Sequence, residues 1–219
     1  MPPDLLTLAF DTSAAHCAAA LLCGDRELAS AHEEMRKGQT ERLFPLLEEM
    51  LERGGANWAD LDLLGVGIGP GNFTGIRISV SAARGLALSL GIKAVGISPL
   101  EAQAEGHAHP LLSLGAAHAG QVYAARVDRN AMATPALMAP EEALELAKAQ
   151  DLPVCAAPPL VEGVTTAPGL HLLPSGPLAP AIARLAQRRA DDAPERPAPL
   201  YVRPADAAPS RDTAPVILP

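Results

Sequence analysis

Short apolar runs separated by polar turns mark the beginning of the chain. Residues 5–10 and 17–23 are two such runs, and Gly24-Asp25 precedes a third segment at 26–32. Runs of this length bounded by turn residues are typical of strands, and a Gly-Asp pair between apolar segments is typical of a hairpin turn. The pattern therefore predicts a three-stranded meander.

From Thr40 the apolar positions follow a helical period. They recur at i, i+3, i+4, i+7 and i+8, which predicts one apolar helix face made of Leu43, Leu46, Leu47, Met50 and Leu51. We expect Thr40 to cap this helix and Gly54-Gly55 to end it. A buried strand at 61–68, a glycine-rich turn and a second helix at 74–90, ended by Gly91, follow.

The remaining pattern predicts alternating strands and helices up to residue 127. A strand at 92–97, a short helix at 98–105 and a hairpin pair at 111–114 and 121–127 extend the order βββ-α-β-α-β. Beyond residue 130, helical patterns occur at 141–149 and 178–189. The stretch 193–219 contains seven prolines and predicts a tail, since proline interrupts both helices and central strands.

Composition excludes several classes of protein. The chain has 219 residues, 48% hydrophobic and 19% charged, and 17 basic against 25 acidic residues give a net charge of −8. Such a chain buries a core, and it lacks the basic stripe of a protein that binds nucleic acid by itself. We find no signal peptide and no apolar stretch of the ~18–20 residues that a membrane span needs, so we expect a cytoplasmic protein without a membrane anchor.

The turn after the strand at 61–68 is the best candidate for an anion or nucleotide site. Glycines between a buried strand and a helix let backbone amides approach an anion at the helix N-terminus. The candidate residues are Asp11, Thr12, Ser13, Gly69, Gly71, Thr74 and Gly75. The turn has neither the Walker A nor the GxGxxG register. The alternative is that the glycines only permit a tight turn and close packing, and that Asp11-Thr12-Ser13 is a hydrogen-bonded turn.

Metal and nucleophile signatures are absent from the sequence. His107 and His109 are two residues apart, so they do not form an HxxxH pair, and Cys17, Cys23 and Cys155 form neither a CxxC motif nor an even set. No serine lies in a GxSxG elbow. We therefore predict no metal site and no catalytic residue, which disfavours a peptidase.

Small residues on the helix at 74–90 suggest close helix packing. Ser81, Gly85 and Ser89 form a stripe that lets another helix approach, either within the chain or from a partner subunit. On the second alternative, we predict a partner interface made of Leu43, Leu46, Leu47, Met50, Ser79, Ala82, Ala83 and Leu86. Ala83→Arg would then abolish association without unfolding the chain.

Together these segments resemble a known family. The motifs are LAFDTS at 8–13, QTERLFP at 39–45, GIGPGNFTGIR at 67–77, ARGLA at 83–87, GISPL at 96–100 and PLYVR at 199–203. They are similar to the TsaB (YeaZ) family, the bacterial partner subunit for synthesis of threonylcarbamoyladenosine (t6A) in tRNA. The resemblance implies an α/β actin/Hsp70-like (ASKHA) nucleotidyl fold with two related lobes. We assign 1–105 to the first lobe, 106–192 to the second and 193–219 to the tail.

The resemblance also implies a function and partners. The chain would be a non-catalytic scaffold that forms a heterodimer with the TsaD paralogue, with the ATPase TsaE and tRNA joining through the complex. TsaD would transfer threonylcarbamoyl to N6 of adenosine 37 in ANN-decoding tRNAs. No cofactor is expected in this chain, whereas ATP and a metal ion belong to the partner subunits. Alone, the chain would be a monomer or a homodimer.

Some positions depart from the family pattern. Ala116, His118 and Gln121 stand where acidic, basic and acidic residues are common, and Gln39 replaces a frequent histidine.

The alternative function is an actin-like ATP-binding enzyme, an ATPase or small-molecule kinase, that holds ATP-Mg with Asp11-Thr12-Ser13 and the glycine-rich turn. Arg184, Arg188 and Arg189 share one predicted helix, where they serve either as a direct tRNA contact or as a solvated surface.

Overall fold

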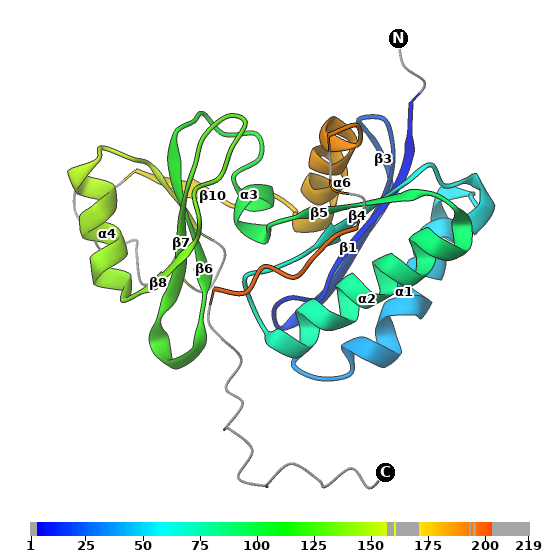
Figure 1. Ribbon diagram of the computed structural model, residues 1–219, viewed down its shortest axis with the longest axis horizontal. Coiled ribbons are helices and arrows are strands. Elements are labelled where there is room, and N and C mark those ends of the chain that lie inside the picture. Colours follow the sequence, from blue (N-terminus) through cyan, green and yellow to red (C-terminus); the bar gives the residue numbers. More distant parts are fainter. Residues whose placement is uncertain (1–3, 157–159, 161–170, 193, 195, 203–219) are drawn as a thin grey trace, which may run out of the picture.

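Two five-stranded sheets form the two halves of the molecule (Figure 1). The computed structural model describes residues 4–156, 160, 171–192, 194 and 196–202. The first sheet contains β1 (Leu6–Asp11), β2 (His16–Cys23), β3 (Arg26–Glu34), β4 (Leu63–Gly67) and β5 (Lys93–Ile97). The second contains β6 (Leu111–Ala116), β7 (Val122–Val127), β8 (Ala136–Met138), β9 (Val154–Ala156) and β10 (Leu172–Pro174).

Both sheets have the same strand order and the same strand directions. The first is ordered β3-β2-β1-β4-β5, and the second, read in the matching direction, β8-β7-β6-β9-β10. In each, the first strand pairs antiparallel with the second and parallel with the fourth. The repeated topology confirms the expectation of two related lobes, and β1–β3 form the predicted meander.

Helices cover both faces of the first sheet. α1 (Gln39–Gly54) and α2 (Phe73–Leu90) lie on one face, whereas α6 (Leu178–Arg189) packs against β1, β2 and β4 on the other (Figure 1). From the sequence, we assign residues 106–192 to the second lobe. Of these residues, helix α6 packs on the first sheet instead. Short helical turns occur at η1 (Trp58–Asp60) and η2 (His118–Gly120).

The start of α1 differs from the prediction. The helix begins at Gln39, and Gly38 is its N-cap in the left-handed conformation, with a φ of 92° and no side-chain cap. Thr40 therefore lies inside the first turn, so its predicted capping role is wrong. Gly55 ends the helix with a φ of 69°, as the Gly-Gly pair indicated.

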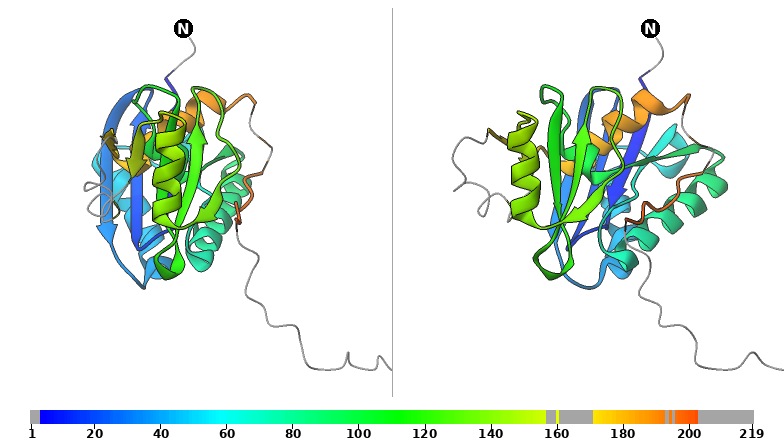
Figure 2. Two further views of the ribbon diagram at one scale, coloured as in Figure 1. Left: turned by 90° about the vertical axis from the view of Figure 1, so that its left-hand side faces the viewer. Right: turned by 60° about the vertical axis from the view of Figure 1, so that its left-hand side comes forward.

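The second sheet is covered on its outer side by α4 (Pro140–Ala149), and α3 (Pro99–Gln103) lies on its other side, toward the first lobe (Figures 1 and 2). Ala143 and Ala147 of α4 are buried against the sheet because alanine allows close helix–sheet contact. No helix among the described residues is long and apolar enough to cross a membrane.

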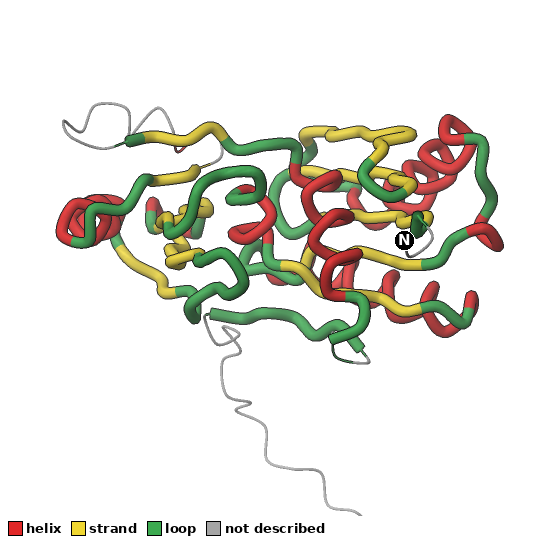
Figure 3. Tube along the Cα trace, turned by 90° about the horizontal axis from the view of Figure 1, so that it is seen from above, coloured by secondary structure: helices red, strands yellow, loops and turns green. Residues whose placement is uncertain are grey.

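The segment 196–202 runs back along the first lobe beside α2 (Figures 1 and 3). Leu200 N–H donates to the carbonyl of Ile68 at 2.8 Å, and Arg84 Nε donates to the carbonyl of Pro197 at 2.8 Å. Most of the predicted tail, residues 203–219, lies outside the described residues.

Candidate functional site: the turn after β1 and the outer helices

Residues Asp11, Thr12 and Ser13 lie at the end of β1, directly against the glycine-rich turn. Thr12 Oγ1 donates to the carbonyl of Gly75 at 2.7 Å. A Cβ atom at Gly75 would lie 1.9 Å from the carbonyl oxygen of Thr12, and one at Gly71 would lie 2.2 Å from that of Ser13. The turn therefore needs glycine for backbone packing, as the alternative reading proposed.

The amides at the N-terminus of α2 already have acceptors within the chain. Asn72 Oδ1 accepts from Thr74 N–H and Gly75 N–H, each at 3.0 Å, and Asn72 N–H donates to the carbonyl of Ser13. Gly69 is left-handed, with a φ of 93°. The structure thus brings the predicted anion-site residues together, but an anion would have to displace these internal hydrogen bonds. Anion binding stays a prediction.

Asp11 is fully buried and has an imidazole partner that sequence reasoning missed. Its Oδ2 accepts from Ser13 N–H at 3.1 Å and Ser13 Oγ at 2.9 Å, and lies 2.6 Å from His16 Nε2. Oδ1 lies over Gly67, where a Cβ would approach it to 1.7 Å, and has no hydrogen-bond partner. The sequence signal that could have indicated this contact is the position of His16, at the start of the strand that follows Asp11.

A second histidine packs on this pair from β3. The rings of His16 and His32 are 4.7 Å apart, and burial together with the neighbouring His16 lowers the pKa of His32. Among the residues that the structure describes, no three His, Cys, Asp or Glu side chains are arranged to hold a metal ion.

These residues do not fit a magnesium nucleotide as the structure arranges them. The donors of Ser13 and the His16 ring all lie against Oδ2 of Asp11, so of the two carboxylate oxygens Oδ1 alone has no partner. In the second lobe, the turn between β6 and β7 contains Ala116, His118 and Gln121, and no carboxylate. The geometry therefore gives no support to the alternative of an ATPase or kinase.

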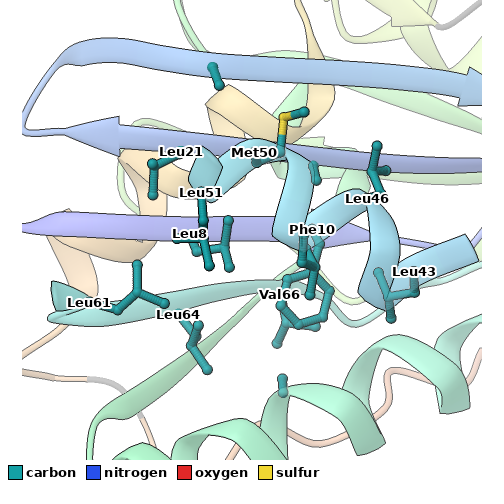
Figure 4. Close-up of a cluster of buried hydrophobic side chains, with 14 of the residues drawn as sticks. Leu8, Phe10, Leu21, Leu43, Leu46, Met50, Leu51, Leu61, Leu64 and Val66 are labelled. Carbon is teal, nitrogen blue, oxygen red and sulfur yellow. The ribbon is translucent and has the colours of Figure 1, made fainter. Parts of the chain in front are cut away.

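The residues predicted for the partner interface divide between the core and the surface. Six of the eight are fully buried and cannot meet a partner in the folded chain, which makes this part of the prediction wrong: Leu43, Leu46, Leu47, Met50, Ser79 and Ala83. The four on α1 belong to the core cluster against the first sheet, and Figure 4 shows Leu43, Leu46 and Met50 among them. Ser79 Oγ donates to the carbonyl of Gly67 at 2.9 Å. Ala82 and Leu86 remain partly exposed.

The outer surfaces of α1 and α2 carry exposed apolar side chains that sequence reasoning did not select. Phe44 on α1 is 45% exposed and Leu88 on α2 is 85% exposed. Near the start of α2, Phe73 packs on Tyr201 with ring centroids 4.5 Å apart, and the Arg77 guanidinium lies 3.8 Å from the Phe73 centroid. Exposed aromatic, arginine and leucine side chains on neighbouring elements are typical of protein interfaces.

The two helices differ in charge. α2 contains Arg77 and Arg84 and no acidic residue, whereas the exposed surface of α1 includes Glu41, Glu48 and Glu52. Arg42, also on α1, is bound by Glu33 and Glu49 at 2.6 Å each. An acidic helix therefore lies beside a basic one on the same face of the sheet.

The arginines considered for tRNA contact have acidic partners. Arg189 pairs with Glu101 at 2.6 Å and Arg188 pairs with Glu105. Both contacts join α6 to α3 or to the residues just after it. The sequence left a tRNA contact or a solvated surface as alternatives for these arginines. It did not predict that two of the three form ion pairs within the chain.

Comparisons with known proteins identify the family. Residues 32–197 match the family model described as TsaD, tRNA N6-adenosine threonylcarbamoyltransferase. The chain is 34% identical over 128 residues to the TsaB protein of Escherichia coli, named for tRNA threonylcarbamoyladenosine biosynthesis, and the match covers 56% of this chain and 55% of the relative. The chain belongs to this family, and within it to TsaB (YeaZ).

Other family members agree with this assignment. TsaB of Haemophilus influenzae is 36% identical over 102 residues, 47% of this chain and 43% of that protein. Matches thus span about half the length of these curated relatives. The solved structure of YeaZ from Pseudomonas aeruginosa superimposes with a TM-score of 0.72 at 26% identity, covering 90% of this chain and 99% of that one.

A more distant structure supports the fold alone. The ethanolamine utilization protein EutJ from Carboxydothermus hydrogenoformans superimposes with a TM-score of 0.55 at 12% identity, over 84% of this chain and 90% of that one. Together with the two sheets of matching topology, these likenesses confirm the actin/Hsp70-like (ASKHA) fold.

Proposed function

We propose that the chain is a non-catalytic subunit in the biosynthesis of threonylcarbamoyladenosine in tRNA, and that it binds a TsaD paralogue. The names of its TsaB relatives support the pathway. A non-catalytic role agrees with the turn around Asp11 and Thr12, where the hydroxyls of Thr12 and Ser13 donate to groups within the chain. The transferase chemistry, with its ATP and metal ion, then belongs to the partner subunits.

The observation that carries the proposal is the exposed face of α1 and α2. Leu88 and Phe44 offer apolar contacts, and the basic α2 and acidic α1 lie side by side. The TsaD family model matches residues 32–197, which include α1 and α2, so we expect a TsaD paralogue to have a similar helix pair. A pseudo-twofold pairing would place the acidic helix of one subunit on the basic helix of the other.

The test is association in solution, measured by light scattering on a size-exclusion column with the paralogue from the same cell. We expect a species of the summed mass, and we expect tRNA modification only when both chains, TsaE, ATP and tRNA are present. Leu88→Glu, which places a carboxylate on the basic helix, should weaken association at least about tenfold. Its control is Ala149→Glu, which adds the same charge to an exposed position of α4.

Two outcomes would reject the proposal. One is that the wild-type chains never associate, even with TsaE and nucleotide present. The other is that Leu88→Glu and Phe44→Glu both bind as wild type does, which would place the contact on another surface. The same column shows whether the isolated chain is a monomer or a homodimer.

A further inference from the structure

Helix α3 belongs to the hydrophobic cores of both lobes. Ala102 packs in the apolar cluster of β5 and α6 in the first lobe. Ala104, directly after the end of α3, packs in the apolar cluster of Leu111 and Val127 in the second lobe. Figure 1 shows α3 between the two sheets. A connection between two lobes usually crosses the surface with few contacts, which leaves the lobes free to move. This connection is buried on both sides.

On the side of the second lobe, α3 is held by a buried hydrogen-bond network. Gln103 Nε2 donates to Ser113 Oγ at 2.6 Å and to the carbonyl of Leu114 at 2.9 Å. Ser113 Oγ in turn donates to the carbonyl of Leu100 at 2.7 Å. Cys155 Sγ, on β9, donates to the carbonyl of Gln103 at 3.1 Å. Breaking one member would leave buried polar groups without partners.

The backbone of β6 is shaped for this contact. A Cβ at Gly115 would lie 3.1 Å from Leu100 Cδ2, a tight contact that would require the Leu100 side chain to shift slightly. Glycine at this position leaves room for Leu100 of α3 to lie against β6.

On the side of the first lobe, α3 is held by ion pairs to α6. The guanidinium of Arg189 donates from two nitrogens to the two oxygens of Glu101, at 2.6 and 3.2 Å. Arg188 pairs with Glu105, just after α3. α6 itself packs on the first sheet, so these pairs fix α3 to that lobe. A forked arginine–carboxylate pair restrains orientation as well as distance.

We propose that α3 locks the two lobes into one rigid body, so that this chain does not open and close between its lobes. Ligand-driven hinge closure requires connectors whose backbone changes conformation, and here the connector between β5 and β6 is anchored to both cores. The chain then acts as a fixed platform. The proposal concerns the chain alone and does not depend on the partner.

The experiment measures the distance between the lobes by double electron–electron resonance. Spin labels are placed at Glu48→Cys on α1 and Glu142→Cys on α4, both exposed, in a Cys23→Ser background. Cys17 and Cys155 are buried, so they do not react with the label. We expect one narrow distance distribution that millimolar ATP-Mg leaves unchanged. Two populations, or a shift on adding ATP-Mg, would overturn the proposal.

Variants then test whether α3 is the lock. Gln103→Leu with Ser113→Ala removes the buried network, and Arg189→Met removes the forked pair; in each, the single narrow distribution should be lost. Arg126→Met is the control, because it removes an ion pair with Asp128 within the second lobe. Circular dichroism confirms folding. If the double variant does not fold, Arg189→Met decides: a folded chain with an unchanged distribution would overturn the role of α3.

Discussion

His16 Nε2 lies 2.6 Å from Oδ2 of Asp11, so a histidine at the start of β2 closes over the buried carboxylate at the end of β1. The same oxygen accepts from the hydroxyl and the amide of Ser13. All three contacts use Oδ2, whereas the buried Oδ1 has no hydrogen-bond partner. Ser13 and His16 therefore direct their polar groups toward Asp11 Oδ2, within the turn between β1 and β2.

Loss of the imidazole should destabilise the fold. His16→Ala removes one of the three groups bonded to a fully buried carboxylate, so we expect the free energy of unfolding to fall by about 1–3 kcal/mol. Urea unfolding followed by circular dichroism measures the change. His32→Ala is the control, because the described contact between His32 and this pair is ring packing. Equal losses in both variants would show that the bond to Asp11 contributes nothing.

Two glycines on α2 should respond to alanine in opposite directions. At Gly75 a Cβ would lie 1.9 Å from the carbonyl oxygen of Thr12, so Gly75→Ala must displace backbone and should cost more than about 3 kcal/mol. At Gly85 nothing lies within 4 Å, so Gly85→Ala should stabilise the helix by about 0.5–1 kcal/mol. Thermal unfolding of both variants compares them, and a loss at Gly85 would contradict the expected open space.

The apolar period of α1 was enough to predict the helix but not what its apolar face contacts. Leu43, Leu46 and Leu47 obey the same spacing whether they meet their own sheet or another subunit, because the period reports burial and not the buried partner. The sheet on which they pack is assembled from strands on both sides of the helix in the sequence, from β1 to β5. The exposed Phe44 and Leu88 break the pattern of a polar outer face, and that signal was present in the sequence.

The sequence was enough to predict which residues form the site at the end of β1, but not the hydrogen bonds between them. The sequence brought Asp11, Thr12 and Gly75 together correctly, since a strand end and a glycine-rich turn meet at the same edge of the sheet. It did not show that Asn72 would satisfy the first amides of α2, nor that His16 would face Asp11. Both depend on the register of β1 against β2 and on the path of the loop into α2.

Ala83→Arg should test folding and not association. Ala83 is fully buried in the cluster beneath α2, so an arginine there would have to bury a charge or force the helix away from the sheet. We expect an insoluble or unfolded chain, with a loss of more than about 3 kcal/mol. Leu88→Arg, five residues further along the same helix, should stay within about 0.5 kcal/mol of wild type, because Leu88 is exposed. Solubility and thermal unfolding separate the two; a stable Ala83→Arg variant would contradict the placement of this face.

Two buried thiols should make the fold sensitive to alkaline pH. Burial raises the pKa of Cys17 and of Cys155 from 9.0 to about 11, with nearby Glu33 adding to the effect at Cys17. Because the folded pKa exceeds the unfolded one, the protonated thiols stabilise the fold fully below pH 9, and this stabilisation is lost as the pH rises toward 11. Between these values the free energy of unfolding should therefore fall more steeply for the wild type than for Cys17→Ala with Cys155→Ala. Urea unfolding at several pH values gives both slopes, and parallel slopes would show that the thiols do not titrate differently in the folded chain.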